Sequence, residues 1–384
     1  MRTVGPFLLT LALIISGAVL ANEPAHWRNR GYHYAPKTRV PFKAKWISVA
    51  KKGRIFKYKR REFSSPFVFG ELLFLGSDNG TFYAIQKSNG HKKWRFKANG
   101  TINSKAIGDG RRVYFGDDKG ILYALESDSG KLIWERPLGS EILSAPVIEE
   151  GRLYLAASEG QVYAIDASDG RTVWQVDHLT PPLQMAVRGN SPPVLDGRGR
   201  LYLGFSDGTF RALSTRDGRV IWEKRLMNDG NGFSDLDAPP LIEGDNIYLS
   251  LFDGPLYALS LKSGNILWSR DLGSGVSIVG EGKTLFVSGS RGSLYALNKA
   301  DGEVLWETKV GEGALTAPVV YQNILAVGLS SSTMNFFERE TGKLLYRRFT
   351  KKGISSDPAI DEGRLYYFSN GGRLYSLKLL PRSP

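Results

Sequence analysis

Apolar and polar positions repeat along this 384-residue chain with a period of about 40 residues. Each copy holds an alternating stretch such as Phe82-Tyr83-Ala84-Ile85, then a polar turn with a glycine, then a stretch that ends in an aromatic residue. Alternation of this kind predicts β-strands. Glycine favours a tight hairpin between them because it adopts a positive φ at little cost. The aromatic ends are Trp46, Trp94, Trp134, Trp174, Trp222, Trp268, Trp306 and Tyr346.

The eight aromatic ends predict eight blades of a β-propeller. Upstream of each alternating stretch, segments such as 144–155 add two more strands around a turn, which gives four antiparallel strands per repeat. The chain stops after a third strand at 372–380, and segment 40–46 is an unpaired tryptophan strand. We therefore predict an all-β fold over residues 40–384, an eight-bladed propeller of four-stranded antiparallel blades whose ring is closed by the N- and C-terminal strands.

The small and large residues of the repeat should face each other. Most copies pair an alanine in the third strand with the tryptophan of the fourth, whereas the seventh copy has Phe336 and Tyr346 at these places. The residue in the third strand is thus larger and the residue in the fourth strand smaller than in the other copies. This compensation in side-chain size predicts that the pair meets at a contact between blades.

Charge is concentrated in one segment. The formal net charge is +13, and residues 22–62 hold 13 Lys or Arg against Glu23 and Glu62, a surplus of 13 − 2 = +11. The body is nearly neutral, so a nucleic-acid-binding surface is excluded as a general function. The chain has no cysteine, which excludes disulfides, thiolate catalysis and cysteine zinc sites. Residues 1–21 are typical of a secretory signal peptide, and 22–39 form an N-terminal extension.

Three connections from a tryptophan strand to the next repeat are long, and all three should lie at one face of the ring. Two of them join adjacent repeats, at 178–193 and 227–240. The first offers apolar side chains beside Arg188, and the second offers two carboxylates around Leu236. Apolar anchors flanked by charges favour a protein-docking patch, although the charges can equally tie the two neighbouring loops together. The candidate partner-binding residues from this argument are Arg188, Asp235, Leu236 and Asp237.

The third long connection, 47–63, is basic with interleaved aromatic residues. It is either a solvated loop or a contact for anionic lipid headgroups, to which each clustered Lys or Arg contributes about 1 kcal/mol near the surface. An anionic partner protein or polysaccharide is a further alternative. The candidate residues are Lys51, Lys52, Arg54, Lys57, Lys59, Arg60 and Arg61.

The sequence offers no convincing catalytic or metal site. Gly204-Phe205-Ser206-Asp207-Gly208 matches Gly-x-Ser-x-Gly, but it falls at a repeat hairpin rather than at a strand-to-helix elbow. His26 and His33 lie in the extension, His91 should be exposed on a hairpin, and His178 is alone on a long loop. Asp117-Asp118 and the pair Asp166 and Asp169 resemble calcium ligands only loosely. We expect no catalytic residue, no metal and no cofactor.

The repeat resembles the pyrroloquinoline-quinone-type propeller repeat, most clearly in Tyr163-Ala-Ile-Asp-Ala-Ser-Asp-Gly-Arg-Thr-Val-Trp174. This superfamily contains both quinone enzymes and non-enzymes. Within it the chain looks most like the BamB family, the propeller subunit of the outer-membrane β-barrel assembly machinery. The likeness is sharpest in 183–192, which resembles the family's Leu-Arg-Gly-x-Ser-Ala-Pro loop, and in 234–239, which resembles its Ser-Asp-Val-Asp segment.

The resemblance implies a non-catalytic periplasmic scaffold that assists outer-membrane β-barrel assembly and insertion. It implies that the two adjacent loops dock a polypeptide-transport (POTRA) domain of a BamA-like barrel subunit, and it assigns this role to Met185, Val187, Arg188, Asp235 and Asp237. Unfolded outer-membrane proteins are further candidate partners. One departure is Asn22, where lipoproteins of the family have the lipidated cysteine. Together with the basic segment, this suggests that electrostatic contact with an anionic membrane replaces the lipid anchor. The alternatives are a quinone-dependent dehydrogenase-like enzyme and a propeller that binds an envelope polymer.

Overall fold

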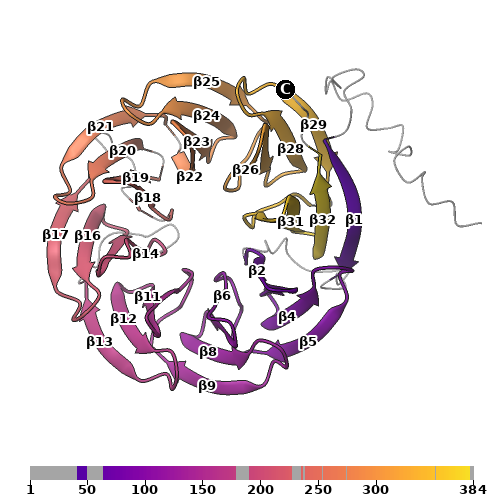
Figure 1. Ribbon diagram of the computed structural model, residues 1–384. Coiled ribbons are helices and arrows are strands. Elements are labelled where there is room, and N and C mark those ends of the chain that lie inside the picture. The colour runs from indigo at the N-terminus through magenta and orange to yellow at the C-terminus, as the bar shows by residue number, and fades with distance from the viewer. Residues whose placement is uncertain are drawn as a thin grey trace, which may run out of the picture. The chain divides into compact units, whose positions relative to one another are not determined.

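The computed structural model describes residues 41–49, 64–178, 190–226, 235–236, 238–252, 254–273, 275–350 and 352–380. In these residues the regular structure is β-strand, arranged as eight four-stranded antiparallel sheets. The sheets stand side by side in a ring, and the four strands of each sheet lie one outside the next, from the centre of the ring to its rim (Figure 1). The predicted eight-bladed propeller is confirmed.

The blades follow chain order, and the strands of each blade are named from the innermost to the outermost. Blade 1 comprises β2 (Phe67–Phe69), β3 (Leu72–Leu75), β4 (Thr81–Gln86) and β5 (Lys92–Lys97), and blade 2 comprises β6 (Ile107–Gly108), β7 (Arg112–Gly116), β8 (Ile121–Glu126) and β9 (Leu132–Pro137). Blade 3 comprises β10 (Val147–Glu149), β11 (Arg152–Ala156), β12 (Gln161–Asp166) and β13 (Thr172–Asp177), and blade 4 comprises β14 (Val194–Leu195), β15 (Arg200–Gly204), β16 (Thr209–Ser214) and β17 (Val220–Arg225). Blade 5 comprises β18 (Leu241–Glu243), β19 (Asn246–Ser250), β20 (Pro255–Ser260) and β21 (Ile266–Asp271), and blade 6 comprises β22 (Gly275–Glu281), β23 (Thr284–Gly289), β24 (Ser293–Asn298) and β25 (Val304–Lys309). Blade 7 comprises β26 (Val319–Tyr321), β27 (Ile324–Gly328), β28 (Thr333–Glu338) and β29 (Leu344–Phe349), and blade 8 comprises β30 (Ala359–Asp361), β31 (Arg364–Ser369), β32 (Arg373–Leu379) and β1 (Phe42–Val49).

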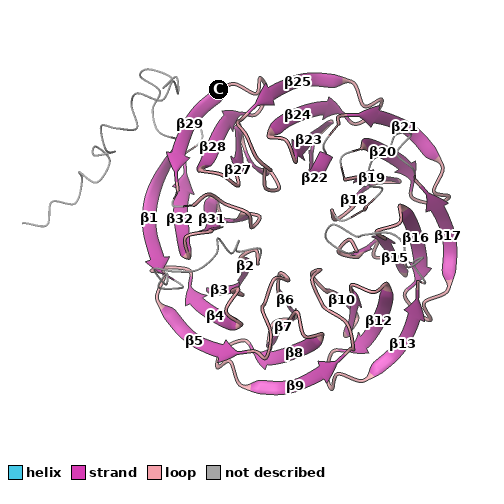
Figure 2. Cartoon of the chain, turned by 180° about the vertical axis from the view of Figure 1, so that it is seen from behind, coloured by secondary structure: helices cyan, strands magenta, loops and turns pink. Residues whose placement is uncertain are grey.

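The eighth blade is built from both ends of the chain. Strand β1 pairs antiparallel with β32, with Phe42 opposite Leu379 and Val49 opposite Arg373. Figure 2 shows β1 outside β32 at the rim. The strand expected at 40–46 therefore closes the ring as predicted, although it extends to residue 49. Closure leaves no unpaired edge between the first and last repeats.

Antiparallel topology divides the connections between two faces. The turn between the second and third strands of each blade lies on the same side as the connection to the next blade, and we call this side the connection face. The other two turns of each blade lie on the hairpin face. The three long connections are all of the blade-to-blade type, so the strand ends that they join lie at the connection face.

The core lies between the blades rather than at one centre. Eight clusters of buried apolar residues are found among the described residues, and each draws on two neighbouring blades. Blades 1 and 2, for example, share Phe82 and Phe115, whose ring centroids lie 3.9 Å apart. Each blade is therefore stable only against its neighbours.

The alanine and the tryptophan of the repeat are opposite each other across a strand pair, as predicted. Ala84 pairs with Trp94, and Phe336 pairs with Tyr346 in blade 7. The contact between blades, however, is made by the hairpin glycine of the next blade: a Cβ on Gly130 would lie 2.5 Å from the Trp94 ring. The indole N–H of Trp94 also donates to the carbonyl oxygen of Ser127, at 3.0 Å.

This indole hydrogen bond recurs from blade to blade. It joins Trp46 to Lys87, Trp94 to Ser127, Trp134 to Ala167, Trp174 to Thr215, Trp222 to Leu261, Trp268 to Lys299 and Trp306 to Arg339. The junction of blades 7 and 8 differs, because Tyr346 replaces the tryptophan. There Phe42 fills the space, with ring centroids 4.9 Å from Phe336 and 5.4 Å from Tyr346.

Candidate functional site

The two adjacent long connections are both fastened to one turn on the connection face. This turn, residues 204–209, joins β15 to β16, and we call it the blade-4 turn. The first long connection follows β13 and leads into blade 4, and the second follows β17 and leads into blade 5. The inserted residues 179–189 and 227–234 lie outside the described residues, so the site is built from the anchors on either side of them.

His178 anchors the beginning of the first connection. Its backbone N–H donates to the carbonyl oxygen of Gly160 at 3.1 Å, and its Nε2 lies 3.1 Å from Asp207 Oδ2. The imidazole also packs on Phe205, with ring centroids 3.9 Å apart, and only 6% of the residue is exposed. The expectation that His178 stands alone was wrong, because its partner lies 29 residues away in the next blade.

The Asp207 carboxylate is held from two sides. Besides His178, the backbone N–H of Thr209 donates to its Oδ1 at 2.9 Å. Burial raises the pKa of this carboxyl, but the hydrogen bonds from His178 and Thr209 outweigh it and hold the pKa well below its usual range. Asp207 is therefore an ionised group in the interior of the blade junction.

The far end of the first connection returns to the same turn. The side-chain amide of Asn190 donates to the carbonyl oxygen of Ala157 at 2.7 Å. The backbone N–H of Ser191 donates to the Gly204 carbonyl oxygen at 3.0 Å, and the Gly204 N–H donates to Ser191 Oγ at 2.7 Å. These bonds fix the entry into blade 4.

The second connection rejoins the ring at Asp235 and Leu236. The Leu236 N–H donates to the carbonyl oxygen of Phe205 at 3.3 Å, and its side chain covers Gly204, where a Cβ would lie 2.3 Å from the Leu236 Cβ. The Asp235 carbonyl oxygen accepts a hydrogen bond from the Phe252 N–H at 2.8 Å. Both Asp235 and Leu236 are 2% exposed.

Of the residues proposed for partner binding, the structure therefore describes two. Asp235 and Leu236 are buried, which favours for them the alternative in which the loops are tied down. Leu236 fills the same place as Ile102 and Ile142, which cover the corresponding glycines of blades 1 and 2. The others, Met185, Val187, Arg188 and Asp237, lie outside the described residues, as do the seven basic candidates within 51–61.

The catalytic and metal signals in the sequence have structural explanations. The Gly204–Gly208 motif joins two strands, β15 and β16, so Ser206 is not at a strand-to-helix elbow. Asp117 is buried, and its two oxygens accept hydrogen bonds from the N–H groups of Gly100, Lys119 and Ile121 and from the Tyr123 hydroxyl. No cluster of three potential metal ligands occurs among the residues that the structure describes. His91 is exposed, as predicted.

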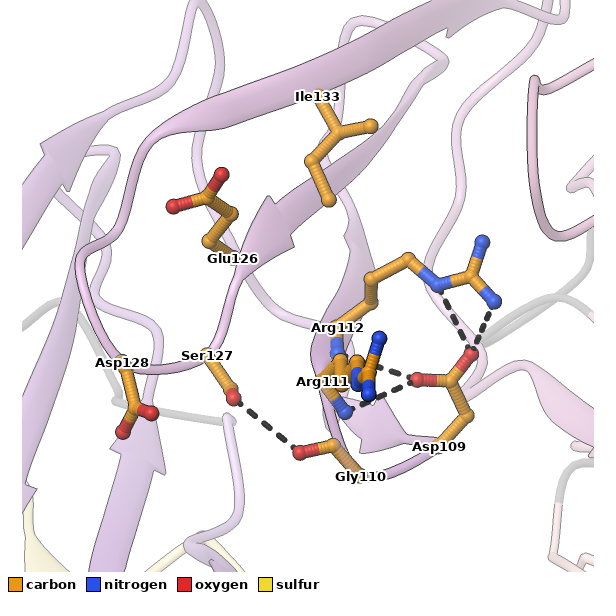
Figure 3. Close-up of a pocket in the computed structure, with 8 residues that line it drawn as sticks. All are labelled: Asp109, Gly110, Arg111, Arg112, Glu126, Ser127, Asp128 and Ile133. Atoms are coloured by element: carbon orange, nitrogen blue, oxygen red, sulfur yellow. Dashed lines mark hydrogen bonds and ion pairs between the residues drawn. The ribbon is translucent and has the colours of Figure 1, made fainter.

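A groove of about 630 Å³ lies at the hairpin face of blade 2 (Figure 3). Its polar groups already serve the junction with blade 3. Arg112 Nε donates to Asp109 Oδ2 at 2.9 Å, and another guanidinium N–H donates to the carbonyl oxygen of Ala167 at 2.9 Å. Burial raises the pKa of Asp109, but the hydrogen bonds from Tyr114 and Arg112 outweigh burial, so the pKa lies below its usual value. The residues that line the groove are Asp109, Gly110, Arg111, Arg112, Glu126, Ser127, Asp128 and Ile133.

Comparison with known families decides the relationship. The sequence matches the family described as outer membrane protein assembly factor BamB, over residues 78–274 and 252–380. The chain belongs to this family. No curated protein sequence matches it. The two matched regions together include the blade-4 turn and the described anchors of both long connections.

Solved structures show how widely the BamB fold is shared. BamB from Moraxella catarrhalis is 22% identical, with a TM-score of 0.76 over 88% of this chain and 100% of that one. Quinohemoprotein alcohol dehydrogenase from Comamonas testosteroni is 12% identical, with a TM-score of 0.72 over 90% of this chain and 77% of that one. The computationally designed Ika8 protein is 14% identical, with a TM-score of 0.69 over 83% and 96%. Enzymes and a designed protein thus share the ring, so the ring alone does not define a function.

No helix among the described residues is long and apolar enough to cross a membrane.

Proposed function

We propose that this BamB-family chain is a non-catalytic periplasmic scaffold that assists the assembly and insertion of outer-membrane β-barrel proteins. The match to a family described as an outer membrane protein assembly factor supports the proposal. In this role the chain is exported by residues 1–21 and is held at the outer membrane through its partners rather than through a lipid.

The docking surface is the connection face at blades 3 to 5. The observation that supports it is the anchoring of both inserted segments, 179–189 and 227–234, on either side of the blade-4 turn. The other blade-to-blade connections that the structure describes in full are short and follow the repeat. Adjacent insertions with no counterpart in the repeat form a surface that a folded POTRA domain of a BamA-like subunit can contact.

The candidate residues divide into two roles. In our proposal Met185, Val187 and Arg188 contact the partner, and Asp237 adds the opposite charge from the second connection. Asp235 and Leu236 are buried, so they contribute by holding the end of that connection.

An envelope pull-down with tagged protein tests the docking residues. The variants are Arg188→Glu and Asp237→Arg, because reversing the buried Asp235 would disturb the fold. The matched control is Arg171→Glu, whose side chain is 81% exposed on the hairpin face and pairs only locally with Asp169. Like charges brought together in an interface cost several kcal/mol. We therefore expect recovery of the barrel subunit to fall at least about tenfold with each reversal and to be unchanged in the control.

Each outcome discriminates between the functions considered. Failure of the wild type to recover a barrel subunit would refute the scaffold function, and dye reduction after reconstitution with the quinone would then support the dehydrogenase alternative. Recovery of an envelope polymer would support the alternative of a polymer-binding propeller. Equal recovery of the barrel subunit by all four proteins would leave the scaffold function standing and refute the docking residues.

The basic residues between Lys51 and Arg61 are proposed to contact the anionic membrane surface. Flotation with anionic vesicles at low salt should recover the protein, and charge reversal at Lys51, Lys52 and Arg54 should reduce that recovery. Flotation that is indifferent to this reversal would refute the contact.

A further inference from the structure

His178 stands at a position that is apolar in blades 1, 2, 4 and 6 and is threonine, Thr350, in blade 7. In blades 1, 2, 3, 4, 6 and 7 the residue after the fourth strand donates its N–H to a carbonyl oxygen in the turn between the second and third strands. Apolar side chains take this place at Ala98, Leu138, Leu226 and Val310, and they are buried there. In blade 3 the same backbone bond is made by His178. The backbone therefore does not require a histidine, and leucine fits the position in blades 2 and 4.

The histidine instead provides a hydrogen bond across the junction of blades 3 and 4. Its partner, Asp207, lies in the blade-4 turn. The Phe205 ring beneath the imidazole is covered by Arg211, whose guanidinium lies 5.3 Å from the ring centroid and pairs with Glu223. A buried polar pair of this kind adds little net stability compared with an apolar contact, because both groups lose water. What it adds is a fixed geometry, since a hydrogen bond is directional and a leucine contact is not.

The geometry that it fixes is that of the blade-4 turn. Ser191 holds this turn from the first connection through two backbone-linked hydrogen bonds to Gly204, and Leu236 holds it from the second through the carbonyl oxygen of Phe205. The bonds at Ser191 and Leu236 repeat those of other blades. The Thr316 N–H donates to the Gly328 carbonyl oxygen and the Gly328 N–H to Thr316 Oγ1, and the Ile142 N–H donates to the Asp117 carbonyl oxygen at 3.1 Å. The His178–Asp207 pair is the addition to this pattern.

We propose that His178 is a positioning residue for both long connections. Its hydrogen bond to Asp207 holds the blade-4 turn in one arrangement, and the turn transmits that arrangement to Ser191 on one side and to Leu236 on the other. The described anchors of the two connections, Ser191 and Leu236, are thereby held in a fixed relation to each other. This inference rests on the proposed function where it concerns docking, but the coupling of the two connections stands apart from it.

Hydrogen exchange measured residue by residue tests the coupling without any partner. The variant is His178→Leu, which places in blade 3 the residue that blades 2 and 4 already accommodate. We expect the amides of Ser191 and Leu236 to exchange about tenfold faster, because the turn that accepts their hydrogen bonds opens more often. The Ile142 amide, which makes the equivalent bond in blade 2, should keep its wild-type rate and reports any general loss of stability.

Two further variants complete the design. His178→Gln retains an N–H donor of similar reach, so it should restore slow exchange at both amides. His91→Leu removes an exposed histidine on a hairpin and should change neither. Faster exchange at Ser191 alone, with Leu236 unchanged, would refute the coupling. Faster exchange at Ile142 as well would show that the histidine acts on overall stability and would also refute the inference.

Docking is then measured with the same variants. We expect His178→Leu to lower recovery of the barrel subunit at least about fivefold while the Ile142 amide keeps its wild-type exchange rate, and His178→Gln to restore recovery. If exchange responds as expected while the wild type recovers no barrel subunit, the positioning role stands and the proposed function fails. If the wild type recovers the subunit and His178→Leu does so equally, the role of His178 in docking fails.

Discussion

The contact between a tryptophan and the glycine of the next blade predicts an unequal response to two similar substitutions. Gly130 has φ +72°, and a Cβ there would lie 2.5 Å from the Cδ2 and Cε3 atoms of Trp94. Gly151 has φ +74°, and a Cβ there would meet nothing within 4 Å. Replacement of either glycine by alanine therefore imposes the same backbone strain, but only Gly130→Ala also pushes against an indole. The pair separates the two reasons for a glycine in the hairpin.

The expected magnitudes follow from the surroundings of Trp94. An alanine in the left-handed backbone conformation destabilises the folded state by about 1–2 kcal/mol. In both variants the lower conformational entropy of the unfolded chain offsets about 0.4–1 kcal/mol of this cost. Gly151→Ala should therefore lower the free energy of unfolding by about 1 kcal/mol. In Gly130→Ala the indole must move by about 1 Å to reach an ordinary contact distance. It is held by the Ser127 carbonyl oxygen and packs against Phe74 at 5.8 Å. Overpacking adds about 1–3 kcal/mol and a weakened hydrogen bond about 1 kcal/mol, so the total is about 3–5 kcal/mol.

Urea unfolding followed by circular dichroism measures this difference, with Trp94→Leu as a second background. Leucine is smaller than the indole, so in that background Gly130→Ala should cost no more than Gly151→Ala. Equal destabilisation by the two alanine substitutions in the wild-type background would refute the steric role of Gly130. A penalty at Gly130 that persists in the Trp94→Leu background would refute the assignment of that role to the indole.

Two further predictions concern single side chains. Because the pKa of Asp207 is lower in the folded chain than its unfolded value of about 3.9, this carboxylate contributes stability above that pH, and the contribution is lost as pH falls toward the folded pKa. Melting temperatures measured from pH 6 to pH 3 should therefore fall less steeply for Asp207→Asn than for the wild type, and parallel curves would contradict the shift. Phe42→Ala should lower the free energy of unfolding by about 3–5 kcal/mol, because Phe42 fills the closing junction beside Phe336 and Tyr346. Ile47→Ala, at an exposed position of the same strand, should change it by less than about 0.5 kcal/mol in the same denaturation assay, and equal effects would contradict the role of Phe42.

Blade number and ring closure could be predicted from the sequence because they depend on periodic features. Tryptophan and glycine recur at nearly fixed spacing, and the unpaired strands at the two ends complete one another. The second function of Gly130 was missed, since a positive φ already explained a glycine and the indole beside it comes from an earlier blade. The partner of His178 was missed because it also comes from a different blade. A signal was present, however, because aligning the repeats places His178 where other copies have Ala98, Leu138 and Leu226.

The inserted segments could be located from the sequence but not described, since nothing in the repeat specifies an insertion. Their anchors are predictable in part: Leu236 takes the place of Ile102 and Ile142, so the second connection rejoins the pattern there. In the sequence, the insertion relative to the repeat therefore ends before Asp235. The match also gives Leu236 a structural role, because the repeat uses the side chain at this position to cover a glycine.

Departures from the repeat are of two kinds, and only one of them points to function. At the junction of blades 7 and 8, Tyr346 and Phe336 exchange bulk and Phe42 fills the remaining space, so each change compensates another and the ring closes. At blades 3 to 5 the insertions do not compensate for another change. Blades 1 and 2 make the same backbone bonds with a short connection, so ring closure does not require a longer one. The His178–Asp207 pair is likewise unnecessary for packing, since leucine fits its position elsewhere. Features that the fold does not need, gathered around one turn on one face, are the expected mark of a surface retained for a partner.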